Sequence, residues 1–301
     1  MLRRKSELAD GRAAGLSLLS SFRRMSGGDE GNQPMTKDHF DPQEVAGFER
    51  ATWSRCAGTY VEGFGAMMLE AIGPLLDEAG VSEGGQVLDL GTGPGLVAAA
   101  AAERGAAVIG IDFSKAMLEE ARQRYPGVEF AEAAAESLPY ADGQFSAVIG
   151  NFVLHHLGQP DLALSEACRV LQDGGRAVFT VWGEPSKLEA FGLFFSAVEE
   201  HAGSADLPHG PLFGISDFDV FHQMLRNAGF GESSVRELDM AWRTSSIEPY
   251  LASFADWANL EAFPESTRVA IESTVRERAE QYRSGNVLVL PNPAILVSAV
   301  K

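Results

Sequence analysis

Hydrophobic residues follow two different spacings along this chain, and the spacing divides it into segments. In residues 41–79 apolar side chains recur every three or four positions, which is typical of amphipathic helices. In residues 86–182 short apolar runs alternate with helical stretches, and glycine-containing turns precede most of the runs. This alternation predicts a parallel sheet with helices on both faces, an α/β fold. The expected strands are residues 86–90, 107–111, 128–131, 145–151 and 176–182, and the expected helices are 95–103, 114–124 and 162–171.

The two ends of the chain have different patterns. After residue 182 longer helical patterns predominate, expected at 187–201, 217–228, 247–259 and 266–282, with strand-like segments at 233–238 and 287–300. Residues 1–35 are rich in arginine, serine and glycine and contain no long apolar stretch, so we expect a disordered tail. A transit peptide, or a start codon assigned too far upstream, would explain the same composition.

Composition excludes several classes of function. The formal net charge is −18, with 42 acidic against 24 basic residues, which disfavours a nucleic-acid partner because phosphate backbones are also negative. No apolar run approaches the roughly 20 residues of a membrane-spanning helix. Two cysteines are too few for a disulfide framework, and the histidines lack ligand-like spacing, so we expect no metal site and a cytoplasmic location.

The most informative segment is a glycine-dense turn directly after the first expected strand. Gly91, Gly93 and Gly95 surround Thr92 there, whereas a dinucleotide fingerprint would place its third glycine one position later. Asp89 precedes the turn, where it suits a cationic ligand better than a pyrophosphate. Asp112 ends the second expected strand and can accept hydrogen bonds from the hydroxyls of a ribose. A tight strand-to-helix connection without a ligand is the alternative for the turn alone.

These motifs and those that follow them resemble class I S-adenosylmethionine-dependent methyltransferases, of the subgroup that includes ubiquinone- and menaquinone-biosynthesis methylases. The resemblance covers about residues 40 to 240 and is more specific for the fold and the cofactor than for the substrate. The resembling segments are LDLGTGPG at 88–95, GIDFSKAML at 110–118, AESLPYADGQF at 135–145, NFVLHHL at 151–157 and RVLQDGGR at 169–176.

The resemblance implies a doubly wound, Rossmann-like sheet of seven strands whose last strand is antiparallel. It implies N-terminal lid helices at 36–80, a cofactor-binding core at 81–183, and substrate-capping helices with the final strands at 184–301. S-adenosyl-L-methionine would be the cofactor. The residues expected to bind it are Tyr60, Asp89, Gly91, Thr92, Gly93, Gly95, Asp112, Phe113, Met117, Ala135, Glu136, Asn151 and Val153.

One position departs from the family pattern. An aspartate that accepts a hydrogen bond from the adenine amino group often precedes the Ala-Glu pair, and this chain has Ala134 there. Backbone groups, Glu136 or packing would have to hold the adenine, at a cost of about 1 kcal/mol in affinity. A protein that keeps the cofactor without methylating is the alternative that this departure leaves open.

Methyl transfer needs alignment more than acid–base groups, so a catalytic base is optional. His155 and His156 follow the fourth expected strand, where ligands bind in open α/β sheets, and either could deprotonate a hydroxyl; both could instead be structural. Several phenylalanines between 191 and 221 could line an apolar pocket, although their helical spacing favours ordinary core packing. They are Phe191, Phe194, Phe195, Phe213, Phe218 and Phe221.

We therefore expect methyl transfer to an oxygen, carbon or nitrogen of a small, partly apolar metabolite, with quinone precursors and secondary metabolites as candidates. A small molecule is the expected partner, and the sequence leaves a homodimer open. Three other functions are alternatives: a non-methylating protein that binds S-adenosylmethionine, a nicotinamide-dependent dehydrogenase, and an interaction module with a vestigial pocket. The dehydrogenase is disfavoured by the glycine spacing and by Asp89.

Overall fold

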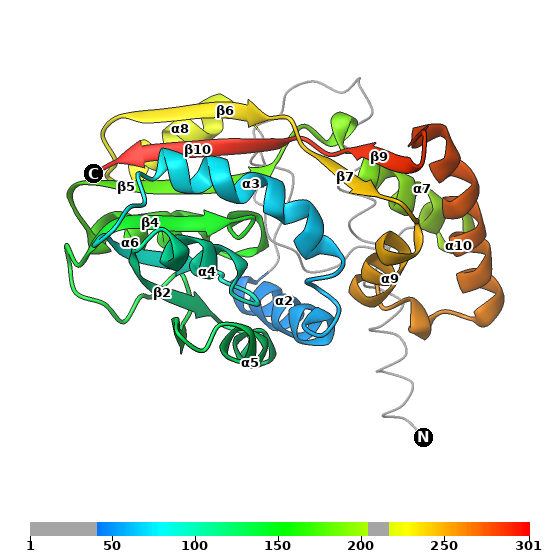
Figure 1. The fold of residues 1–301 in the computed structure, drawn as a ribbon, viewed down its shortest axis with the longest axis horizontal. Helices are drawn as coiled ribbons and strands as arrows, with labels where there is room; N and C mark the ends of the chain where they lie inside the picture. The colour runs from blue at the N-terminus through cyan, green and yellow to red at the C-terminus, as the bar shows by residue number, and fades with distance from the viewer. Residues whose placement is uncertain (1–40, 204–216) are drawn as a thin grey trace.

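A seven-stranded sheet forms the centre of the computed structural model, which describes residues 41–203 and 217–301 (Figure 1). The strand order is β3-β2-β1-β4-β5-β10-β6, and β10 runs antiparallel to both of its neighbours, as expected for the last strand. The expected tail at 1–35 lies outside the described residues. The strands are β1 Gln86–Leu90, β2 Ala107–Asp112, β3 Glu129–Glu132, β4 Phe145–Asn151, β5 Leu171–Trp182, β6 Ser233–Leu238 and β10 Ala294–Val300.

Helices cover both faces of this sheet, so its central strands are buried on both sides. Along β1, Val87 packs with α3, α4 and α5 on one face, and its neighbour Leu88 packs with α6 and α8 on the other. Continuous apolar runs are typical of such doubly covered parallel strands. The helices are α3 Phe64–Glu78, α4 Leu96–Glu103, α5 Lys115–Arg124, α6 Pro160–Val170 and α8 Phe218–Asn227, with a short 3-10 helix, η1, at Leu154–His156.

A second group of elements lies beside the main sheet (Figure 1). It combines helices with a three-stranded antiparallel sheet in the order β7-β9-β8. Its members are α7 Glu189–Ala202, α9 Glu248–Trp257, α10 Glu265–Ala279, η2 Pro185–Lys187, η3 Leu260–Ala262, η4 Glu280–Tyr282, β7 Ala241–Thr244, β8 Arg283–Ser284 and β9 Val287–Pro291.

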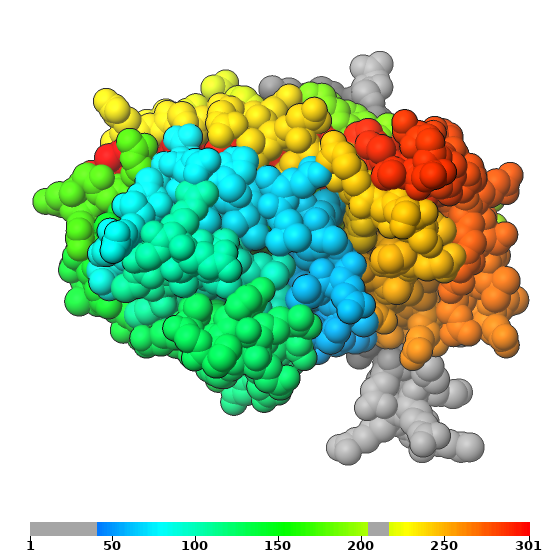
Figure 2. Space-filling view, viewed as in Figure 1, coloured from blue at the N-terminus to red at the C-terminus, as the bar shows by residue number. Residues whose placement is uncertain are grey.

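The first described helix, α2 Pro42–Cys56, lies between these two groups. It contacts α5 of the main layer and α9 of the second group, and Figure 2 shows it bordering both. Asp41 caps it by accepting a hydrogen bond from the Gln43 N–H. The expected helical segment 41–79 is thus two helices, and they are separated at Gly63, where any side chain would overlap Ser253 of α9.

The strand-like segment 287–300 also differs from the expectation. It forms two strands in two sheets, β9 and β10, which are separated by Asn292 and Pro293. The Asn292 N–H still donates to Met240 O, in register with the β7–β9 pairing, but Pro293 has no N–H to continue the ladder. The chain therefore passes from the small sheet into the centre of the large one.

Candidate active site

Two adjoining cavities lie where the strand order of the main sheet reverses, between β1 and β4. This is where open α/β sheets bind ligands. The empty space in them, including the part that opens to solvent, is about 840 Å³ and about 480 Å³, and we call them the larger and the smaller cavity. Shared residues make them one continuous site: Gly91, Asp112, Phe113, Val153, His156 and Leu157.

The glycine turn after β1 forms the floor of this site. Gly91, Gly93 and Gly95 all have positive φ, at 63°, 54° and 86°, a backbone region that favours glycine. The Thr92 N–H donates to Ile111 O at 2.8 Å, which fixes the turn against the end of β2. A methyl group on Gly91 would lie 2.4 Å from a Val153 methyl carbon, whereas one on Gly93 would meet no protein atom within 4 Å. The space above Gly93 is therefore open to a ligand.

Asp112 joins the turn to the second strand. One carboxylate oxygen accepts from the Gly93 N–H at 2.9 Å, and the other accepts from the Ser114 N–H at 2.8 Å. Burial raises the pKa of this carboxyl to about 6. Each oxygen keeps a further lone pair, and the residue lines both cavities, so the carboxylate fits the two hydroxyls of a ribose.

Asp89 supplies an unpaired acceptor beneath the turn. Its Oδ2 accepts from the Thr92 hydroxyl at 2.6 Å, while its buried Oδ1 has no partner among the described residues. Burial raises the pKa of this carboxyl to about 7. A buried acceptor without a partner is costly. Asp89 lines neither cavity and supports the turn through Thr92, whereas Asp112 faces the cavities and fits the ribose of a nucleoside.

The remaining predicted residues divide into those that line the cavities and those that support them. Tyr60, Met117 and Asn151 line the larger cavity, and Ala135 and Glu136 line the smaller one. Asn151 is held by the Thr180 hydroxyl, which donates to its Oδ1 at 2.5 Å. Asp89, Thr92 and Gly95 are not among the residues that line either cavity. They support the site from within or beneath the turn.

The two histidines have different surroundings. His155 is fully buried, its ring nitrogens have no partner among the described residues, and burial lowers its pKa well below the ordinary value. It is also absent from the linings described, so its expected role as a base has no geometric support. His156 lines both cavities and retains a position from which it can reach a ligand.

Sequence reasoning missed the contribution of α2 to the smaller cavity. Ala46 and Arg50 of α2 line it with Ala134, and the Arg50 guanidinium carbon lies 5.5 Å from the centre of the Phe113 ring. The wall therefore carries a methyl group where the family often has a carboxylate, and Arg50 adds a positive charge to a lining that also holds Asp112 and Glu136. The signal for Arg50 was weak because the orientation of α2 depends on its contacts with α5 and α9.

Aromatic side chains dominate the larger cavity. Phe152 and Trp182 stack with ring centres 4.0 Å apart, and Trp182 meets Phe191 edge to face at 4.9 Å. Of the phenylalanines considered from sequence, Phe191 and Phe195 reach the cavity, Phe194 and Phe221 are core residues, Phe218 is exposed, and Phe213 lies outside the described residues. The remaining large apolar residues of the lining are Trp53, Tyr60, Phe64, Met68, Phe113, Met117, Leu157 and Trp257.

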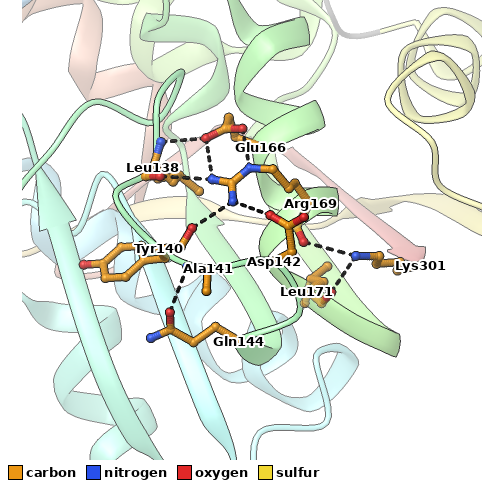
Figure 3. A network of polar contacts seen from close by, with 9 residues as sticks. All are labelled: Leu138, Tyr140, Ala141, Asp142, Gln144, Glu166, Arg169, Leu171 and Lys301. Atoms are coloured by element: carbon orange, nitrogen blue, oxygen red, sulfur yellow. Dashed lines mark hydrogen bonds and ion pairs between the residues drawn. The ribbon is translucent and has the colours of Figure 1, made fainter.

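The loop that carries the smaller cavity is braced from behind by Arg169 of α6 (Figure 3). Its guanidinium donates to the backbone oxygens of Leu138 and Tyr140 and to the carboxylates of Asp142 and Glu166, at 2.7 to 3.0 Å. Pairing with Arg169 lowers the pKa of Glu166 below its usual range. Arg169 thereby fixes residues 138–142, which continue directly from the Ala135 and Glu136 wall.

Other kinds of site find no support within residues 41–203 and 217–301. No group of three histidine, cysteine, aspartate or glutamate residues there could hold a metal ion. No helix in these ranges is both long and apolar enough to cross a membrane.

Comparison with known proteins identifies the family. A methyltransferase domain model matches residues 88–179. The demethylmenaquinone methyltransferase of Clavibacter sepedonicus is 34% identical over 169 residues, which are 52% of this chain and 69% of that protein. An uncharacterized 37.1 kDa protein of the Streptomyces fradiae transposon TN4556 is 41% identical over 189 residues, 60% of this chain and 50% of its own length. The chain spans about half the length of several other relatives that it matches, such as 52% of the Renibacterium salmoninarum demethylmenaquinone methyltransferase.

Solved structures share the fold. The YcgJ protein of Bacillus subtilis superposes with a TM-score of 0.53 at 19% identity, and the match covers 77% of this chain and 97% of that one. The glycine turn, Asp89 and Asp112 lie within the matched segment, and the turn and Asp112 fit a nucleoside cofactor. The chain belongs to the S-adenosylmethionine-dependent methyltransferases.

Proposed function

We propose that this enzyme methylates an oxygen, carbon or nitrogen atom of a small, uncharged, partly aromatic metabolite. The observation that carries the proposal is the aromatic wall of the larger cavity, which begins where the glycine turn ends. Trp182, Phe191 and Phe195 offer flat apolar surfaces to a ring system. Asp112 and His156 are the residues of this lining that can carry a charge near neutral pH, so a multiply charged acceptor would find few counterions there.

S-adenosylmethionine supplies a methyl group on a positively charged sulfur, which is reactive without further activation. The protein's part is to align the acceptor and to exclude water. Asp112 and the turn around Gly93 would hold the nucleoside, with Ala135 and Glu136 beside the adenine. The aromatic wall would then hold the acceptor against the remaining face of the cofactor.

Quinone precursors are the acceptors that we favour within this class. Several relatives are named demethylmenaquinone methyltransferases, and one from Desulfotalea psychrophila is named a ubiquinone/menaquinone biosynthesis C-methyltransferase. A fused aromatic ring of that kind would suit the stacked pair Phe152 and Trp182. Polycyclic secondary metabolites have the same surface chemistry and belong in the same test.

The test is product analysis with defined acceptors. Purified protein and S-adenosylmethionine are incubated with reduced naphthoquinones, with simple phenols and, as a charged comparison, with phosphoethanolamine. We expect products heavier by one CH2 from the aromatic acceptors and none from phosphoethanolamine. A Trp257→Ala variant should raise KM for the aromatic acceptor by about tenfold through lost apolar contact, whereas Phe218→Ala, at an exposed residue, should not. Methylation of phosphoethanolamine alone, or of no acceptor in any panel, would contradict the proposal.

A further inference from the structure

His156 presents one ring nitrogen to the cavities and the other to a buried carboxylate. Its Nδ1 is buried and lies 3.2 Å from Glu49 Oε2, and the two side chains are 15% and 5% exposed. The two atoms are within ion-pair distance but are not yet aligned as a hydrogen bond, an alignment that often tightens only when a ligand binds. Nε2 belongs to the exposed part of the ring, which lines both cavities.

Glu49 is an unusual residue for this place because carboxylates are seldom buried without partners. It belongs to α2, is 4% exposed, and has His156 as its ion-pair partner in the described part of the chain. A carboxylate accepts but does not donate, so a neutral His156 facing Glu49 is expected to carry its proton on Nδ1. A histidine with Nδ1–H held in this way has its Nε2 lone pair free.

The ring is also fixed on its other sides. Trp53, one turn after Glu49 on α2, meets the His156 ring edge to face at 5.0 Å, and the His155 ring lies 4.3 Å away. Two further carboxylates face these cavities: Asp112 of β2 lines both with His156, and Glu136 lines the smaller one. The imidazole is thus held in one orientation by residues from α2 and η1, with its accessible nitrogen toward the ligand.

We propose that Glu49 is a positioning residue that makes His156 the proton acceptor of the reaction, and that the methyl acceptor carries a removable O–H proton. This inference rests on the proposed function. Nε2 takes the hydroxyl proton while the oxygen, or a ring carbon activated by it, bonds to the methyl carbon. The carbon–sulfur bond breaks with its electron pair left on sulfur, so the sulfonium becomes a neutral thioether and His156 becomes the imidazolium.

This chemistry narrows the acceptor class to phenols, hydroquinones and enols. A base at this position gives the largest benefit to a hydroxyl that is not already ionised, because a phenolate needs no proton removed. An amine acceptor with a free lone pair would gain little from it before the methyl group is transferred. Because Glu49 belongs to α2, the base is complete only when α2 is docked against the core.

The first experiment measures the tautomer of His156 and requires no turnover. Protein labelled with ¹⁵N-histidine is studied by long-range proton–nitrogen correlation, and the His156 signals are assigned by their loss in His156→Gln. We expect Nδ1–H in the wild type and in the control Glu44→Gln, a change at an exposed residue of the same helix. Glu49→Met, which removes the acceptor at similar length, should shift the ring to Nε2–H. An Nε2–H tautomer in the wild type, or no change in Glu49→Met, would overturn the inference.

The second experiment uses a series of phenols of graded acidity as acceptors. Glu49→Gln should lower kcat about 10- to 100-fold for weakly acidic phenols, within the range that a general base contributes, and much less for phenols already ionised at the assay pH. Affinity for S-adenosylhomocysteine should stay within about twofold, because Glu49 touches neither Asp112 nor the turn. Equal loss for all phenols would assign Glu49 a purely structural role. If the wild type methylates no phenol, the proposed function fails, while the tautomer measurement still decides the role of Glu49.

Discussion

Three glycines with nearly the same backbone conformation allow the cofactor site to be tested by adding a single methyl group. Gly80, Gly91 and Gly93 have φ of 65°, 63° and 54°, so alanine costs each of them about 1–2 kcal/mol of left-handed strain. They differ in what the new methyl would meet. At Gly80 it meets nothing within 4 Å, at Gly91 it meets Val153 at 2.4 Å, and at Gly93 it enters the larger cavity.

The expected results separate strain, overpacking and ligand exclusion. Gly80→Ala should lose about 1–2 kcal/mol of unfolding free energy and keep full cofactor affinity. Gly91→Ala should lose about 1–3 kcal/mol more, because Val153 must move, and should also bind the cofactor more weakly. Gly93→Ala should be about as stable as Gly80→Ala but should lose at least about tenfold in affinity for S-adenosylhomocysteine, which is about 1.4 kcal/mol.

Urea unfolding of the cofactor-free proteins and calorimetric titration supply the two measurements. Gly80→Ala is the matched control, since it carries the strain without either contact. Wild-type affinity in Gly93→Ala would refute the placement of the cofactor above the turn. Equal stability of Gly91→Ala and Gly80→Ala would refute the packing argument at Val153.

Two further predictions concern the charges around the site. Burial raises the pKa of Asp89 to about 7 and of Asp112 to about 6, from an ordinary value of 3.8, so the folded state binds these protons more tightly than the unfolded chain. Their contribution to stability should therefore increase as pH falls from about 8 towards 4. Affinity for S-adenosylmethionine, which needs the ionised forms, should fall over the same range. Unfolding and titration across this range check both signs, and Asp89→Asn should flatten the dependence of stability on pH. Arg169→Met removes the brace behind the smaller cavity, so it should lower the unfolding free energy by about 2–4 kcal/mol and weaken S-adenosylhomocysteine binding, whereas Arg176→Met, at an exposed position, should change neither. Unchanged affinity in Arg169→Met would show that residues 138–142 do not position the cofactor wall.

The centre of the main sheet was predictable because β1, β2 and β4 are short apolar runs bounded by turn residues. The glycine turn and Asp112 were predictable for a related reason: they lie at the ends of neighbouring strands, so the sheet itself brings them together. The predicted seven-stranded sheet with an antiparallel last strand is confirmed. The small sheet was not predicted, since β7 and β8 have four and two residues and offer too little periodicity.

The parts of the site that sequence could not supply come from tertiary docking. Glu49 and Arg50 are adjacent on α2, yet one is buried against His156 and the other lies over Phe113. Only the docking of α2 on α5 and α9 decides which face of the helix meets the cavities. The two histidines could not be told apart from sequence for the same reason, because neighbouring positions in η1 place His155 in the core and His156 in the lining of the cavities.

Calorimetric titration of the wild-type protein with S-adenosylhomocysteine, with NADH as the comparison ligand, tests the central claim most directly. The account predicts binding of one S-adenosylhomocysteine per chain and no binding of NADH, because the turn around Gly93 and the Asp112 carboxylate suit a nucleoside without a pyrophosphate. Binding of NADH, or no binding of S-adenosylhomocysteine by the folded protein, would contradict it.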